Sequence, residues 1–212
     1  MLDVKVCGLT DAAALAAAAA GGARYLGFVF YPPSPRSLAP ERAAALAGQA
    51  PAGCLKAGVV VDPDDAALDQ LLRLVPLDAL QLHGAETPAR VAAIRAATGR
   101  IVIKALKIEG PDDLAPVAAY AEVADLLLFD AKPGRLPGGN GEAFDWRLLE
   151  GLELARPWLL SGGLSADNLE TAVRLSGARA VDVSSGVEDR PGHKDPERIR
   201  RFLEVAATIG AS

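Results

Sequence analysis

The sequence has little cysteine, few aromatic residues and no long hydrophobic stretch. Its 212 residues include only two cysteines, Cys7 and Cys54, which cannot form the disulfide framework of a small secreted domain. The longest alanine-rich run, residues 12–20, is far shorter than the roughly 20 residues that a membrane-spanning helix needs. No basic segment followed by an apolar one begins the chain, so we predict no signal peptide. These absences predict a cytoplasmic protein that does not bind membranes.

Histidine is also scarce, and acidic residues outnumber basic ones. The formal net charge is −5, which argues against binding to nucleic acid or to anionic membrane surfaces. There are only two histidines, and no His/Cys/Asp cluster has the spacing of metal ligands. We therefore expect neither a nucleic-acid partner nor a metal site.

Alanine is abundant. Half of the chain is hydrophobic but only 5% is aromatic, so the core must consist of Ala, Val, Leu and Ile. No shift of composition and no Gly/Ser/Pro linker divides the sequence. We predict a single domain spanning residues 1–212.

Eight short apolar runs alternate with longer segments of helical pattern. The runs are continuous, as expected for strands buried on both faces of a parallel sheet. They cover residues 4–7, 25–30, 55–61, 79–83, 101–106, 125–130, 158–163 and 180–186. The helices between them have start signals at Thr10-Asp11, Pro40-Glu41, 62–65, Thr87-Pro88, 111–113, 165–167 and 195–197, with a short sixth helix predicted near 144–146.

Eight strand–helix units in 212 residues predict an α/β fold, a single (β/α)₈ TIM barrel of near-minimal length. The rival is a doubly wound open sheet. That fold usually has five or six strands and would leave two units unexplained.

Polar side chains follow the apolar runs, where a barrel places its active site. The residues at these positions are Cys7, Arg36, Asp62, His83, Asp130, Ser161 and Asp182. Each has an ordinary alternative. Cys7 alone could be a small buried apolar residue, Asp130 a helix cap, and Arg36 a surface ion pair. For His83 we favour a hydrogen-bonding role at the rim over metal ligation.

Glycine-rich turns follow the last strands. Gly162 and Gly163 come after the seventh run, and Ser184 and Ser185 after the eighth. Barrels commonly bind phosphate through backbone N–H groups at these loops. Gly139 and Gly141, in the loop after the sixth run, could add further amides. The fingerprints of dinucleotide and nucleoside triphosphate sites are absent, so we predict a sugar phosphate or a similar ligand.

Seven motifs along the whole chain resemble the phosphoribosylanthranilate isomerase family of tryptophan biosynthesis. They are KVCGLT (5–10), GFVFYPPSPR (27–36), QLHG (81–84), LLFDAK (127–132), GGNGEAFDW (138–146), LSGGLSADN (160–168) and DVSSGVEDRPGHKD (182–195). The combination of a cysteine ending the first strand with DVSSGVE ending the eighth is specific to this family.

The resemblance implies an Amadori rearrangement. The small-molecule substrate would be N-(5′-phosphoribosyl)anthranilate and the product 1-(2-carboxyphenylamino)-1-deoxyribulose 5-phosphate. It implies that Cys7 is the general base, Asp130 the general acid and Arg36 the ligand of the anthranilate carboxylate. No metal or redox cofactor is expected, because the substrate supplies its own electron sink. The family includes monomers and homodimers, and the sequence does not choose between them.

Two other functions are consistent with such a barrel. One is another sugar-phosphate isomerase, such as the bifunctional enzyme that also serves histidine biosynthesis. That family has an aspartate where Cys7 stands. Ribulose-phosphate epimerase is a related rival, but it needs more metal ligands than one rim histidine supplies. The other function is a non-catalytic phosphate-binding barrel, which would not need the set formed by Cys7, Asp130 and Arg36.

Overall fold

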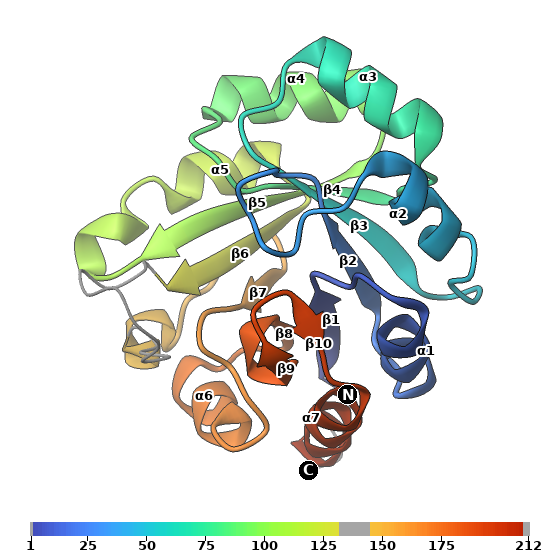
Figure 1. Ribbon diagram of the computed structural model, residues 1–212. Coiled ribbons are helices and arrows are strands. Elements are labelled where there is room, and N and C mark those ends of the chain that lie inside the picture. The colour runs from blue at the N-terminus through green and yellow to red at the C-terminus, as the bar shows by residue number, and fades with distance from the viewer. Residues whose placement is uncertain (1, 132–144, 210–212) are drawn as a thin grey trace.

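A computed structural model describes residues 2–131 and 145–209. Its centre is a closed barrel of eight parallel strands in which β8 pairs with β1 (Figure 1). The strands are β1 (Asp3–Cys7), β2 (Tyr25–Val29), β3 (Leu55–Val60), β4 (Ala79–Leu82), β5 (Ile101–Ile108), β6 (Leu126–Ala131), β7 (Trp158–Leu160) and β8 (Ala180–Val183). Each of the eight predicted runs forms a strand, so the predicted barrel is confirmed.

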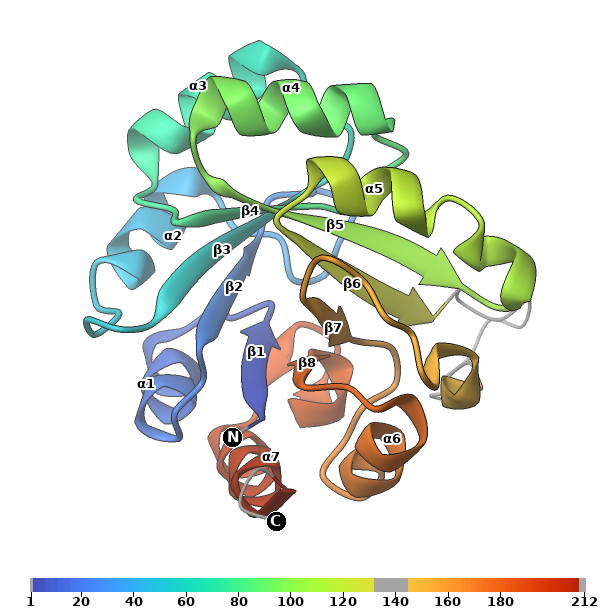
Figure 2. The same cartoon turned by 180° about the vertical axis from the view of Figure 1, so that it is seen from behind.

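Seven α-helices in the described residues surround the strands (Figures 1 and 2). They are α1 (Ala12–Ala20), α2 (Pro40–Ala47), α3 (Asp65–Leu74), α4 (Pro88–Thr98), α5 (Val117–Val123), α6 (Leu169–Ser176) and α7 (Pro196–Ile209). Side-chain oxygens of Asp11, Asp64 and Thr87 accept hydrogen bonds from N–H groups in the first turns of α1, α3 and α4. These are the start signals that the sequence contains, because such caps satisfy N–H groups that have no partner within the helix.

Two crossovers differ from the prediction. The fifth begins as a 3₁₀ turn, Pro111–Leu114, and α5 follows it. In the sixth, the described residues form only a 3₁₀ turn, Trp146–Leu149, instead of the predicted α-helix. Gly151 has a φ of +68°, a conformation that ends helices and favours glycine. A short hairpin of β9 (Glu188–Arg190) and β10 (His193–Lys194) was not predicted from the sequence.

Apolar side chains pack the helices against the barrel, and the aromatic residues Phe28, Phe129 and Phe202 are among them. Inside the barrel, six buried residues form one cluster: Ala57, Ala79, Ile103, Ala105, Leu128 and Leu159. A second cluster, of Cys7, Val29 and Val59, lies toward the carboxyl ends of β1, β2 and β3. The filling is not wholly apolar, because Lys5 and Asp182 form a buried ion pair between β1 and β8.

Candidate active site

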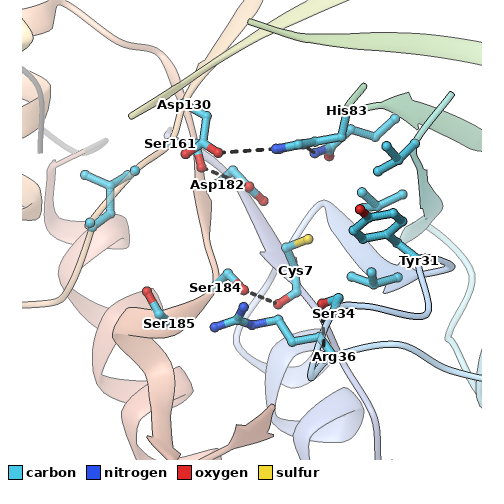
Figure 3. A pocket seen from close by; sticks show the side chains of 17 residues that line it. Cys7, Tyr31, Ser34, Arg36, His83, Asp130, Ser161, Asp182, Ser184 and Ser185 are labelled. Atoms are coloured by element: carbon cyan, nitrogen blue, oxygen red, sulfur yellow. Dashed lines mark hydrogen bonds and ion pairs between the residues drawn. The ribbon is translucent and has the colours of Figure 1, made fainter. Parts of the chain in front are cut away.

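A cavity of about 290 Å³ lies at the carboxyl ends of the strands. Nine predicted site residues of the described chain line it: Cys7, Arg36, His83, Asp130, Gly162, Gly163, Asp182, Ser184 and Ser185 (Figure 3). Asp62, also predicted at a strand end, does not line this cavity; its carboxylate accepts a hydrogen bond from the Ala85 N–H. Gly139 and Gly141, the other two predicted phosphate ligands, lie outside the described residues. The barrel thus brings together groups that are up to 178 positions apart in the sequence.

Cys7 is the last residue of β1 and is buried. Its carbonyl accepts a hydrogen bond from the Ser184 hydroxyl at 3.1 Å. Burial raises the pKa of the Cys7 thiol, and the ammonium of Lys5 opposes this without overcoming it. Burial therefore favours the protonated thiol of Cys7. The cation that a cysteine base requires is present, but desolvation outweighs it.

Asp130 faces His83 across the cavity (Figure 3). His83 Nε2 lies 3.4 Å from the Asp130 carboxylate, and each side chain is 25% exposed. The other ring nitrogen, Nδ1, lies 3.0 Å from the amide nitrogen of Gln81. This contact with the Gln81 amide orients the ring so that Nε2 faces Asp130. His83 thus takes the rim position predicted for it, next to the predicted acid.

Arg36 lines the cavity but is also ion-paired. Its Nε and Nη2 each donate to the Glu188 carboxylate at 2.7 Å. Glu188 accepts a third bond from Lys194 Nζ at 2.5 Å. Burial would raise the pKa of Glu188, but Arg36 and Lys194 together hold it below its ordinary value. A buried carboxylate therefore fixes one edge of the guanidinium in place.

The glycine turn after β7 has a conformation that other residues rarely adopt. Gly162 and Gly163 have φ values of +89° and +67°, and a Cβ at Gly162 would lie 2.5 Å from the backbone nitrogen of Ala131. Asn168 braces this turn by donating to the Gly163 carbonyl and accepting from the Ser165 N–H. Both glycines are therefore required by the backbone conformation of the loop.

The loop after β8 packs against this turn. A Cβ at Gly186 would collide with the backbone carbonyl of Leu164, so the two loops touch only because residue 186 is glycine. Gly162, Gly163, Ser184 and Ser185 line one side of the same cavity as a result.

Three charged residues that support the site were not predicted from the sequence. Lys5 is buried and pairs with Asp182 at 2.9 Å, and Glu188 and Lys194 hold Arg36 and Ser184. The lysine inside the apolar run 4–7 was a usable signal, because a lysine is almost never fully buried without a partner. Glu188 is 152 positions from Arg36, and Lys194 reaches Glu188 through the hairpin of β9 and β10, so the role of neither residue could be predicted locally.

In the described part of the chain, no group of three or more His, Cys, Asp or Glu side chains is placed to hold a metal ion. None of the helices described is long and apolar enough to cross a membrane.

The chain is similar to known isomerases along nearly its whole length. The family model for N-(5′-phosphoribosyl)anthranilate isomerase matches residues 4–205. The chain is 59% identical over 208 residues to the N-(5′-phosphoribosyl)anthranilate isomerase of Paracoccus denitrificans, covering 97% of each chain. It is 59% identical over 212 residues to that of Rhodospirillum centenum, covering 98% of this chain and 99% of the relative.

Solved structures with the same barrel carry the same name. The phosphoribosylanthranilate isomerase of Thermotoga maritima superposes with a TM-score of 0.89 at 35% identity, over 98% of this chain and 100% of that one. A second structure, at 33% identity and a TM-score of 0.86 over the same shares, is of such an isomerase in complex with reduced 1-(o-carboxyphenylamino)-1-deoxyribulose 5-phosphate.

Proposed function

Since the chain belongs to the N-(5′-phosphoribosyl)anthranilate isomerase family and is an isomerase of tryptophan biosynthesis, we propose that Cys7 and Asp130 are the base and the acid of its reaction. The reaction converts N-(5′-phosphoribosyl)anthranilate to 1-(2-carboxyphenylamino)-1-deoxyribulose 5-phosphate. The observation that carries the proposal is the placement of both side chains in one cavity, which Arg36 and the loops of Gly162–Gly163 and Ser184–Ser185 also line. The cavity therefore offers an acid, a base and two anion sites.

Asp130 starts the reaction by opening the sugar ring. Its carboxylic acid protonates the ring oxygen while the bond between that oxygen and C1 breaks, which leaves a cationic Schiff base at C1. The aspartate that results lies 3.4 Å from His83 Nε2, so the imidazole ring lies beside the new negative charge. A quarter of the Asp130 side chain is exposed, which gives the carboxyl access to a proton for the next turnover.

Cys7 then moves the hydrogen of C2. Its thiolate removes the C2 proton, and the electrons of that C–H bond flow into the iminium to form an enolamine. A proton added at C1 and the loss of the proton on O2 complete the ketone. C1 is reduced and C2 is oxidised within one molecule, so the atoms and electrons balance without an external redox cofactor. Burial disfavours the thiolate of Cys7. In the complex, the positive charge of the Schiff base acts in the opposite direction and favours the thiolate.

Two anion sites hold the ends of the substrate. Glu188 uses the Nε and Nη2 edge of Arg36, and the Nη1 edge is the part of the fork that takes the anthranilate carboxylate. The phosphate lies on the N–H groups of Gly162, Gly163, Ser184 and Ser185. Support comes from the similar isomerase that was crystallised with a reduced ribulose phosphate product.

A direct assay tests the proposed reaction. The purified protein should convert N-(5′-phosphoribosyl)anthranilate with saturation kinetics, measured by the loss of anthranilate fluorescence, and inorganic phosphate should compete with the substrate. A folded sample that turns over only a different sugar phosphate, or binds phosphate without turnover, would overturn the assignment.

Arg36→Ala is expected to raise KM for the substrate by about ten- to a hundredfold, because it removes a charge-assisted hydrogen-bond pair of about 1.5–3 kcal/mol. The inhibition constant of inorganic phosphate should change much less. Arg42→Ala is the matched control, since Arg42 is a neighbouring arginine that donates to the Thr10 carbonyl instead. Equal losses of substrate and phosphate affinity in Arg36→Ala would contradict the role of carboxylate ligand.

A further inference from the structure

Two charged residues lie inside the barrel directly beneath Cys7. Lys5 and Cys7 are two positions apart on β1, so their side chains point to the same face of the strand. Lys5 is opposite Asp182 on β8 in the strand register, and Lys5 Nζ donates to Asp182 Oδ1 at 2.9 Å. The second Asp182 oxygen accepts from the Ser161 hydroxyl at 3.1 Å. The ammonium is therefore held in one place by a carboxylate that is itself fixed.

The ammonium and the sulfur approach each other because a side chain is missing beside them. Gly27 is opposite Cys7 in the register of β1 and β2. A Cβ built on Gly27 would lie 3.2 Å from Lys5 Nζ and 3.2 Å from Cys7 Sγ. Both groups border this one position, so the ammonium of the fully buried Lys5 and the thiol of Cys7 are neighbours.

We propose that Lys5 is a positioning residue of the reaction, whose buried ammonium, anchored by Asp182, stabilises the thiolate of Cys7 from inside the barrel. The role of Cys7 as base, on which this rests, belongs to the proposed function. A buried ion pair is costly to desolvate and is often no more stabilising than apolar residues of the same size. Here the pair has a second effect, because its positive end lies beside a thiol that must ionise.

Several other ionisable groups face Cys7, and they act in both directions. They are Asp182 from β8, Lys194 from β10 and, around the cavity, Tyr31, Arg36, His83 and Asp130. Lys5 favours the charged form of Cys7 more strongly than Lys194 does, whereas Asp182 disfavours it. The ammonium of Lys194 is shared between Glu188 and Ser184. Burial would lower the pKa of Lys5, but Asp182 and Cys7 raise it above its ordinary value, so Lys5 stays charged throughout the pH range of the reaction.

The rate of alkylation of Cys7 as a function of pH tests the proposal without using turnover. In a Cys54→Ala background, Cys7 is the only thiol, and its reaction with iodoacetamide follows the fraction of thiolate. Lys5→Met should move the midpoint of this profile upward by about one to three pH units. Asp182→Asn should move it downward, because the ammonium remains and the competing carboxylate is gone. A merely structural role of the pair would not give shifts of opposite sign.

Two further variants keep the test decisive. Lys104, on β5, is another buried lysine, and its Nζ lies 2.6 Å from the Glu86 carboxylate. The Lys104→Met variant should leave the alkylation midpoint of Cys7 unchanged. Lys5→Met leaves Asp182 as an uncompensated buried charge. If that variant does not fold, the neutral double variant Lys5→Met/Asp182→Asn replaces it, with a midpoint still above that of the parent. An unmoved midpoint in the Lys5 variants, or an upward shift in Asp182→Asn, would overturn the proposal.

The same measurement separates this inference from the proposed function. If Cys7 were not the base, Cys7→Ser would retain turnover, yet the alkylation midpoints would still shift as described. If Lys5 did not act on Cys7, the midpoints would stay in place while Cys7→Ser still lost turnover. If both proposals are correct, the pH at which kcat/KM rises should be higher in Lys5→Met than in the parent, and the alkylation midpoint should increase with it.

Discussion

Cys7→Ser is expected to lower kcat by about 10²- to 10⁴-fold, the contribution typical of a general base. A serine hydroxyl occupies nearly the same space as the thiol but is a far weaker acid. Burial already raises the pKa of the Cys7 thiol, and a serine hydroxyl in the same place would ionise to an alkoxide even less readily. The fold should persist, because the substitution leaves the contacts of this small side chain with Val29 and Val59 almost unchanged.

Steady-state kinetics and thermal unfolding measure the two parts of this expectation separately. Cys54→Ser is the matched control. Cys54 lies before β3, away from the cavity, where its thiol contacts the Ala23 carbonyl at 3.4 Å. That variant should keep kcat within a factor of about two. A Cys7→Ser enzyme that turns over like the parent would show that another group removes the C2 proton.

The barrel was predictable because its signals are local and repeated. Eight continuous apolar runs and the polar residues that end them are each readable within a few residues, and closure of the sheet follows from their number. Asp11, Asp64 and Thr87 cap helices where the sequence indicates. The helix predicted in the sixth crossover was wrong, because the backbone becomes extended at Glu150, after one 3₁₀ turn, and Gly151 follows at a φ of +68°.

The position of Cys7 and Asp130 at the rim could be predicted from the sequence, but the ion pairs around them could not. Cys7 and Asp130 end strands, and parallel strands bring those ends to one rim. The partner of Arg36 could not be predicted, because Glu188 is 152 positions away and reaches it through a hairpin that the sequence does not signal. The raised pKa of the Cys7 thiol could not be predicted from the sequence either, because desolvation depends on the packing of neighbours from other strands.

Asp130→Asn is expected to lower kcat by about 10²- to 10⁴-fold, because an amide can occupy the same position but cannot protonate the ring oxygen. The substrate should still bind, since its phosphate and carboxylate ligands are unchanged, and KM should therefore move much less than kcat. An acid that acts on ring opening also leaves a specific signature. A substrate analogue already in the open Schiff-base or enolamine form should be processed by Asp130→Asn more nearly at the parent rate than the closed sugar is.

Asp125→Asn provides the control, because Asp125 immediately precedes β6 whereas Asp130 lies near its carboxyl end. The two side chains have nearly the same exposure, 24% and 25%. Asp125 binds Arg95 and the Val102 N–H, so its substitution should lower Tm and leave kcat in place. If Asp130→Asn instead lowered Tm and spared kcat, its carboxylate would be a structural partner of His83, and the ring would have to be opened by another acid of the cavity.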